Sequence, residues 1–314
     1  MTETIGGLGV GHWTNPEART GCTVIVFPDG TVASGEVRGG APATREFALL
    51  DPSRIVASVD AVVLSGGSAF GLASADGVMA ELEHAGRGFP TRFGRVPIVV
   101  GMSLYDLGVG DPAIRPGRDE GRSACREALA SIGRPITGGR IGAGCGATVG
   151  KWGGSAIDGG LGVATVVESV AESIVDEAGD TRLVVMALIA VNAFGFIDDG
   201  SLGDEPGRPQ PPAFEPAAGQ IEGAVETSAD RSNTTIGVIV TNARISKGDC
   251  HLLAQSGHDG LARSLLPAHT AVDGDALVAA ATGELEVDVD VMWLRALAQA
   301  AVVRAVRSAG ATSL

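Results

Sequence analysis

Runs rich in β-branched residues alternate along the chain with segments whose apolar residues recur at helical spacing. The β-branched runs are bounded by Gly, Pro or Asp and predict seven strands: Cys22–Phe27, Asp60–Leu64, Val96–Gly101, Gly160–Val167, Arg182–Val191, Thr234–Asn242 and Ala276–Thr282. The segments at helical spacing predict four helices: Ser68–Ala85, Arg118–Ile132, Ser246–Leu265 and Asp290–Ser308. This mixture predicts an α/β (α+β) fold in which packed sheets are covered by helices.

Local residues support the helix boundaries. Gly86 is expected to end the first helix as a C-cap, and Ser246 to open the third as an N-cap. Arg304 and Arg307 lie late in the last helix, where the helix dipole favours positive charge. A segment rich in Pro, Gly and acidic residues, Asp198–Gln220, predicts an exposed loop or linker.

The composition is typical of a folded, soluble protein. Of the 314 residues, 45% are hydrophobic and 19% are charged, which is enough for a packed core and argues against disorder. The net charge of −14 disfavours nucleic acid and anionic membranes as partners, because both attract basic surfaces. No secretory signal and no apolar run long enough to span a membrane is visible, so we expect a cytoplasmic protein.

Glycine is abundant and cysteine is scattered. The 47 glycines, together with few aromatic residues, predict close backbone packing and many tight turns. Cys22, Cys125, Cys145 and Cys250 show no C-x-x-C spacing, which predicts buried thiols.

Three glycine-rich segments approach familiar motifs without completing them. Gly142–Ala147 fits the spacing of a dinucleotide fingerprint, but the residues after it are a poor opening for the helix that would hold the pyrophosphate. Gly146–Lys151 is one residue short of a P-loop. Gly66–Gly71 has Phe70 where a nucleophile elbow needs glycine. That turn is expected to allow close strand–helix packing or to lend backbone N–H donors to a site.

The most informative segment is the entrance to the predicted strand at Thr234. Asn233 precedes this hydroxyl residue, and a polar, turn-forming stretch comes before both. Asp273 and Asp275 supply two carboxylates that are expected to fold back onto the hydroxyl. Asn before β-branched residues is also an ordinary way to enter a strand, and Asp-Gly-Asp is an ordinary polar turn. A metal site made of His269 and the two aspartates is a further alternative, although no second His lies at ligand spacing.

The residues at this junction suggest an enzyme that cuts its own backbone before Thr234. A threonine hydroxyl is a poor nucleophile unless a base removes its proton, and an N-terminal threonine carries that base as its own α-amino group. The pKa of a free α-amino group is about 7.7–8.0, so an appreciable fraction is neutral near physiological pH. Before cleavage, that nitrogen is held in the amide between Asn233 and Thr234.

Seven blocks, in order along the chain, give it a resemblance to a known family. They are Arg19–Val24, Val37–Pro42, Leu64–Leu72, Gly142–Lys151, Ala190–Ala193, Asn233–Ile236 and Asp273–Asp275. With these blocks the whole chain resembles the P1 family of self-processing aminopeptidases. This family includes the DmpA-type L-aminopeptidase/D-amidases, the β-peptidyl aminopeptidases and the nylon-oligomer hydrolases. Each block alone is weak, but the ordered set is specific.

The resemblance implies a fold and an activity. The fold would be the αββα sandwich of the Ntn-hydrolase-like DmpA/ornithine acetyltransferase type, formed as a single domain by residues 1–314. Self-cleavage would divide it into an α-chain, 1–233, and a β-chain, 234–314, within a homotetramer that needs no cofactor or metal. The substrate would be a short peptide-like amide, namely a peptide, a β-peptide or an ω-amino-acid (nylon-type) oligomer. It would be hydrolysed through an acyl-threonine ester.

The resemblance also implies roles for residues around the nucleophile. Asp273 and Asp275 match the acidic pair of the nylon-oligomer hydrolases and are expected to orient the threonine or tune its amine. Some aminopeptidase relatives have Ser and Glu at these two places. Lys151 matches a lysine near the nucleophile, and Asn192 matches an asparagine that donates to the oxyanion. Tyr105 matches a tyrosine that would also donate to the oxyanion.

Two rival functions remain open at this level. A metal-dependent hydrolase using His269, Asp273 and Asp275 would lose activity to chelators. A non-catalytic relative that only binds small amides would tolerate replacement of Thr234 by alanine.

Overall fold

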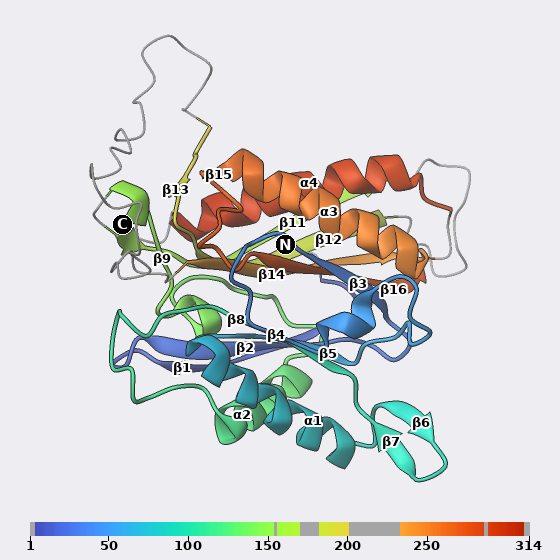
Figure 1. Ribbon diagram of the computed structural model, residues 1–314. Coiled ribbons are helices and arrows are strands. Elements are labelled where there is room, and N and C mark those ends of the chain that lie inside the picture. Colours follow the sequence, from blue (N-terminus) through green and yellow to red (C-terminus); the bar gives the residue numbers. More distant parts are fainter. Residues whose placement is uncertain (1–3, 154–155, 170–181, 201–232, 286–287, 311–314) are drawn as a thin grey trace.

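The computed structural model describes residues 4–153, 156–169, 182–200, 233–285 and 288–310. Two five-stranded sheets lie face to face, and two helices cover the outer face of each sheet (Figure 1). The layers therefore follow the order α, β, β, α, which confirms the expected sandwich. Among the helices described, none is both long and apolar enough to cross a membrane.

The first sheet has the strand order β1-β2-β5-β8-β4. Its strands are β1 (Gly9–Asn15), β2 (Thr20–Val26), β4 (Thr44–Arg45), β5 (Ala61–Ser65) and β8 (Val99–Ser103). Strands β5 and β8 are parallel, and the other neighbouring pairs are antiparallel. A parallel pair needs a crossover, which here contains α1 (Ser74–His84). Helix α1 packs beside α2 (Arg118–Ala130) on the outer face of the sheet (Figure 1).

The second sheet has the strand order β11-β12-β14-β16-β3. Its strands are β3 (Val32–Val37), β11 (Gly160–Ser169), β12 (Arg182–Asn192), β14 (Thr234–Ala243) and β16 (Ala276–Leu285). The central strand β14 is antiparallel to β12 and parallel to β16. Helix α3 (Lys247–Ser264) forms the crossover between β14 and β16, and it covers the sheet together with α4 (Val291–Gly310) (Figure 1).

Alternate residues of the central strand fill two separate apolar layers. In β14, Ile236, Val238 and Val240 pack between the two sheets. Ile239 and Ala243 pack on the other face, under α3 and α4. Because both faces are covered, all ten residues of β14 are buried. This double burial explains why the middle of the strand, Ile236–Val240, is a continuous apolar run in the sequence.

Glycine allows the helices to approach the sheets closely. A Cβ at Gly11 in β1 would lie 2.2 Å from the carbonyl oxygen of Ala124 in α2. A Cβ at Gly162 in β11 would lie 1.8 Å from the carbonyl oxygen of Ala305 in α4. Real Cβ atoms do not approach backbone oxygens so closely, so these positions require glycine. The close backbone packing predicted from the glycine content is therefore found in both halves of the sandwich.

Short ribbons and 3₁₀ helices complete the described part of the chain. The ribbons pair β6 (Phe89–Thr91) with β7 (Gly94–Val96), β9 (Thr148–Val149) with β10 (Ile157–Asp158), and β13 (Phe196–Ile197) with β15 (Leu265–Leu266). The 3₁₀ helices span Phe47–Leu50, Ser68–Ala73, Gly142–Gly144 and Lys151–Gly153.

The seven predicted strands and four predicted helices are found with shifted ends. The strand predicted at Val96–Gly101 begins only at Val99, after Pro97, which has no N–H to donate to a sheet. The helix predicted at Ser68–Ala85 starts as a 3₁₀ helix and becomes α-helical at Ser74. Three strands of the two sheets were not predicted. Strands β1 and β3 mix glycine and polar residues with few β-branched ones, and β4 has only two residues.

Several local predictions are also confirmed. Ser246 caps α3, since its hydroxyl accepts a hydrogen bond from the Asp249 N–H at 3.1 Å. Gly86 has φ +71, as expected of a residue that ends a helix. The four cysteines are buried free thiols. Most of the loop predicted at Asp198–Gln220, from residue 201 on, lies outside the described residues.

Candidate active site

At one end of the second sheet, the last residue of β12 meets the first residues of β14 and β16. Thr234 begins β14 and stands directly opposite Asn192, which ends β12. Residues directly opposite in an antiparallel pair project their side chains from the same face. On the other side, Asn233 forms a parallel bridge with Asp273, just before β16. The sheet thus brings together residues that are far apart in the sequence.

The Thr234 hydroxyl contacts the carbonyl of the preceding peptide unit. It donates a hydrogen bond to the Asn233 carbonyl oxygen, and the Gly274 N–H donates to the same oxygen at 3.0 Å. Thr234 is only 4% exposed, so the contact is shielded from bulk water. A Cβ at Gly274 would lie 2.8 Å from Thr234 Oγ1 and 2.7 Å from the Ala41 carbonyl oxygen. Glycine therefore lets the backbone N–H reach the carbonyl without displacing the hydroxyl.

Asp273 is buried and is held by donors from two segments. Its Oδ2 accepts hydrogen bonds from the Thr270 N–H at 2.8 Å and from the Thr270 hydroxyl at 2.6 Å. Its Oδ1 accepts from the Phe194 N–H at 3.3 Å. Burial raises the pKa of the Asp273 carboxyl, and the neighbouring charge of Asp275 raises it further. Asp273 thus closes a turn and is also a titratable group beside the junction.

Asp275 is equally buried and links the nucleophile's strand to a histidine. Its Oδ1 accepts a hydrogen bond from the Thr235 N–H at 2.7 Å. Its Oδ2 lies 2.8 Å from His269 Nδ1 and accepts from the His269 backbone N–H at 3.1 Å. Asp275 therefore holds the residue that follows Thr234, whereas the Thr234 hydroxyl is directed to the Asn233 carbonyl.

Asn192 is oriented by three donors on its side-chain oxygen. Oδ1 accepts hydrogen bonds from Lys151 Nζ at 2.9 Å, from the Thr148 N–H at 3.0 Å and from the Thr148 hydroxyl at 3.4 Å. An amide NH₂ group cannot accept such bonds, so the amide cannot be flipped. Nδ2 donates to the Tyr105 carbonyl oxygen at 3.0 Å. Lys151, which was predicted to lie near the nucleophile, thus acts directly on Asn192.

Tyr105 reaches this group through its backbone. Its carbonyl accepts from Asn192, while no hydrogen bond of its phenol to another described residue is found. The residue is partly exposed. Donation by the phenol to an oxyanion stays a prediction.

The geometry does not favour the metal alternative. Both ring nitrogens of His269 face protein oxygens, since Nδ1 lies against Asp275 and Nε2 lies 3.1 Å from the His258 carbonyl oxygen. Both Asp273 oxygens also accept protein hydrogen bonds. Within the described residues, no group of three or more His, Cys, Asp or Glu side chains has the arrangement of a metal site.

The turn that resembles a nucleophile elbow has a structural role beside Tyr105. The buried carboxylate of Asp106 accepts from the Gly67 N–H and from the Thr20 hydroxyl, each at 2.7 Å. A Cβ at Gly71 would lie 1.8 Å from the Gly66 carbonyl oxygen. The turn therefore packs closely, as expected, and its backbone donor holds the segment that follows β8.

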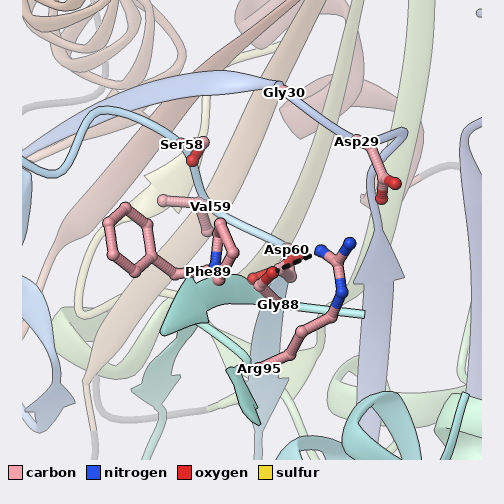
Figure 2. A pocket seen from close by; sticks show the side chains of 9 residues that line it. Asp29, Gly30, Ser58, Val59, Asp60, Gly88, Phe89 and Arg95 are labelled. Atoms are coloured by element: carbon pink, nitrogen blue, oxygen red, sulfur yellow. Dashed lines mark hydrogen bonds between the residues drawn. The ribbon is translucent and has the colours of Figure 1, made fainter. Parts of the chain in front are cut away.

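Among the residues that the structure describes, several cavities lie outside this hydrogen-bonded group, two of them beside short strands. One, of about 150 Å³, lies beside the β6–β7 ribbon, where the Arg95 side chain donates to the Gly88 carbonyl oxygen at 3.0 Å (Figure 2). The other, of about 560 Å³, lies beside β9 and β13 and includes Val149 and Phe196 in a mainly apolar lining. The second cavity adjoins the chain segment that carries Lys151.

Sequence reasoning missed three contributors to this arrangement. The Gly274 N–H is a backbone donor, which leaves no signature beyond the glycine itself. Thr148 lies within the Gly142–Lys151 block, but its contact with Asn192 depends on the pairing of distant segments. His269 was considered only as a metal ligand, and its spacing of six residues from Asp275 would have suggested a pair within one turn.

Comparison with known proteins extends these observations to the whole chain. The sequence matches peptidase family S58 over residues 3–313. It is 41% identical over 302 residues to an uncharacterised aminopeptidase of Mycobacterium leprae, a match that covers 90% of this chain and 78% of that protein. It is 30% identical over 293 residues to a 6-aminohexanoate-oligomer endohydrolase of Paenarthrobacter ureafaciens, covering 89% of this chain and 74% of that protein.

Solved structures show the same fold at lower identity. A β-aminopeptidase from Burkholderia sp. has a TM-score of 0.66 at 22% identity, covering 97% of this chain and 84% of that one. The L-aminopeptidase D-Ala-esterase/amidase of Ochrobactrum anthropi, described as a variant of the Ntn-hydrolase fold, has a TM-score of 0.65 at 17% identity. That match covers 98% of this chain and 85% of that one. Because the expected fold is found and the family model matches nearly the whole chain, the chain belongs to peptidase family S58, a family of amide-bond hydrolases with the Ntn-hydrolase fold.

Proposed function

We propose that this protein is a self-cleaving amide hydrolase whose nucleophile is the N-terminal threonine created at Thr234. The observation that carries the proposal is the contact between the Thr234 hydroxyl and the Asn233 carbonyl, on which the Gly274 N–H also converges. A hydroxyl held against a carbonyl whose oxygen already accepts a backbone N–H is arranged for attack on that carbonyl.

Self-cleavage would proceed in two steps. Thr234 Oγ1 attacks the Asn233 carbonyl carbon, and the Gly274 N–H stabilises the charge that develops on the carbonyl oxygen. The C–N bond breaks, the hydroxyl proton passes to the departing nitrogen, and an ester joins Asn233 to the Thr234 oxygen. Water then hydrolyses the ester, which leaves chains 1–233 and 234–314 and frees the Thr234 amine.

The two chains would remain one folded unit after the cut. The 234–314 chain contributes β14 and β16, which lie between β12 and β3 of the other chain. Its Leu253, Leu277 and Val302 share an apolar layer with Leu183 and Ile189 of the 1–233 chain. Separating the chains would expose this layer to water, at a cost of about 25 cal/mol for each Å² of apolar surface.

Substrate hydrolysis would use the amine that self-cleavage frees. The neutral Thr234 amine accepts the hydroxyl proton as Oγ1 attacks the substrate carbonyl. The tetrahedral intermediate collapses to an acyl–Thr234 ester as the substrate's amine leaves with a proton, and water then hydrolyses the ester. The Asn192 amide, held by Lys151 and Thr148, projects from the same face as Thr234 and is our candidate donor to the oxyanion, with the Tyr105 phenol as a second.

We propose a short peptide-like amide as the substrate, namely a peptide, a β-peptide or an ω-amino-acid oligomer. The support comes from the relatives, which include aminopeptidases and 6-aminohexanoate-oligomer endohydrolases. The cavity of about 560 Å³ beside β9 and β13 falls in the size range of small-molecule sites, and its lining combines apolar residues with the charged Asp158, Asp199 and Arg307. A cytoplasmic homotetramer of cleaved protomers remains part of the proposal.

Replacement of Thr234 tests the proposal against its rivals. Thr234→Ala is expected to abolish hydrolysis of amide and 6-aminohexanoate oligomer substrates, whereas Thr234→Ser keeps a hydroxyl and should retain activity. A chelator is expected to leave the wild-type rate unchanged, while a metal-dependent hydrolase would lose activity. Full activity of a folded Thr234→Ala protein would contradict the proposal.

A further inference from the structure

His269 occupies an unusual backbone position next to the junction. It lies in the segment between β15 and β16, and its φ of +56 falls in the left-handed region that residues other than glycine rarely adopt. Its side chain is 16% exposed, and its backbone N–H donates to Asp275 Oδ2 at 3.1 Å. The residue is therefore fixed in a costly conformation by the group it contacts.

Both nitrogens of the His269 ring face oxygen acceptors. Nδ1 lies 2.8 Å from the Asp275 carboxylate, and Nε2 lies 3.1 Å from the His258 carbonyl oxygen. A neutral imidazole carries a single N–H, so one of these contacts would set a nitrogen lone pair against an oxygen lone pair. The imidazolium form has an N–H for each acceptor.

We propose that His269 is a positioning residue that carries a positive charge in the working enzyme and thereby fixes the Asp275 carboxylate in place. The inference rests on the proposed function of Thr234. Through its other oxygen, Asp275 accepts the Thr235 N–H at 2.7 Å, and this bond anchors the strand immediately after the nucleophile. The chain of contacts thus runs from a surface-accessible imidazolium to the backbone that carries Thr234.

The other titratable groups near His269 are compatible with a positive charge on its ring. The His258 ring lies with its centroid 4.9 Å from that of His269, and burial lowers the pKa of His258 to about 4, so it stays neutral. The positive charge of Arg38 opposes protonation of His269, but Arg38 is paired with Glu36 at 3.2 Å and with Asp259 at 3.0 Å. Asp275 is therefore the dominant charge that His269 contacts.

The pKa of His269 is shifted in the direction that favours the imidazolium form. Burial alone lowers the pKa of His269, but the hydrogen bond and the charge of Asp275 outweigh it, so the pKa of His269 is raised. Burial and the Asp275 charge also raise the pKa of the Asp273 carboxyl.

The first test is the pH profile of His269→Asn. Asparagine tolerates the left-handed backbone and can donate to Asp275, but it carries no charge. Loss of a nearby positive charge makes the Thr234 amine harder to deprotonate, so the acid limb of the kcat/KM profile is expected to move up by about 1–3 pH units. His269→Lys, which restores a charge, should move the limb back.

His251→Asn provides the matched control. His251 lies on α3, where its Nδ1 contacts the Gly35 carbonyl oxygen at 3.2 Å, and it has no contact with the aspartate pair. The same substitution there should leave the acid limb in place. An unmoved limb in His269→Asn, even with a lower rate, would assign His269 a packing role only and overturn the proposal.

A second measurement reads the charge of His269 directly in the wild-type fold. In ¹⁵N-histidine-labelled protein, nitrogen chemical shifts distinguish imidazolium from neutral imidazole across a titration. The chain has five histidines, and we expect the His269 signals to remain those of imidazolium at pH 7 while His258 remains neutral. A neutral His269 at pH 7 would overturn the proposal. The readout needs no turnover and can be repeated in Thr234→Ala, so it separates failure of this inference from failure of the proposed function.

Discussion

Gly274→Ala is expected to slow self-cleavage by about 10- to 100-fold. The new Cβ would lie 2.8 Å from Thr234 Oγ1 and 3.2 Å from Thr234 Cγ2, whereas ordinary contact begins at 3.4 Å. Restoring that contact requires the hydroxyl to retreat by about 0.6 Å from its present place. Misplacing a reacting group by about 1 Å costs on the order of 100-fold in rate, which sets the upper end of the expected range. The Cβ would also lie 2.7 Å from the Ala41 carbonyl oxygen. The backbone at residue 274 therefore cannot relieve the clash with Thr234 by shifting toward Ala41.

The assay is the fraction of cleaved chain over time after expression or refolding, measured on denaturing gels and by mass spectrometry. Gly248→Ala is the matched control, because a Cβ there would meet nothing closer than the Ser246 hydroxyl at 3.6 Å. The control should cleave at the wild-type rate. If folded Gly274→Ala protein also cleaves at the wild-type rate, then the contact between Gly274 and the Thr234 hydroxyl does not limit the reaction and the reasoning is wrong.

Three further predictions follow from individual contacts. Lys151→Met removes a donor to Asn192 and should lower kcat for amide hydrolysis by about 10- to 100-fold, but it should slow self-cleavage much less. Equal losses in the two reactions would contradict the assignment of Asn192 to substrate hydrolysis and of the Gly274 N–H to self-cleavage. Lys247 donates to three backbone carbonyls at 2.8–3.0 Å. Lys247→Met should therefore lower the free energy of unfolding, measured by denaturant titration, by about 2–4 kcal/mol. An unchanged denaturant concentration at the unfolding midpoint would refute this. Because burial lowers the pKa of His258 to about 4, only the unfolded state binds its proton between pH 6.5 and 4. Wild-type stability should therefore fall with decreasing pH by up to about 3 kcal/mol more than that of His258→Asn, and parallel pH curves for the two proteins would contradict this.

Local sequence patterns were sufficient to predict all four α-helices and most strands of the two five-stranded sheets. The apolar run after Thr234 and the Ser246 cap both act over a few residues, and both are found where expected. Strands β1 and β3 escaped prediction because their glycine and polar residues hide the alternation that burial imposes only after the sheets are assembled. The glycine content pointed to close packing, but not to which helix each glycine faces.

The arrangement around the junction depends on strand register, which a single sequence does not reveal. Asn192 and Thr234 lie opposite one another only because β12 and β14 pair in one register. The two aspartates lie beside the junction. Asp275 holds a backbone N–H, and Asp273 closes its own turn through Thr270. The polar-turn interpretation and the active-site interpretation of Asp-Gly-Asp are therefore compatible.

The central claim is that the bond between Asn233 and Thr234 is broken by the Thr234 hydroxyl. Intact-mass spectrometry of the purified protein tests this most directly, with Thr234→Ala measured in parallel. We expect two wild-type fragments that correspond to residues 1–233 and 234–314, and one unsplit chain for Thr234→Ala. A wild-type chain that stays whole after long incubation, or a Thr234→Ala chain that splits at the same bond, would contradict the account.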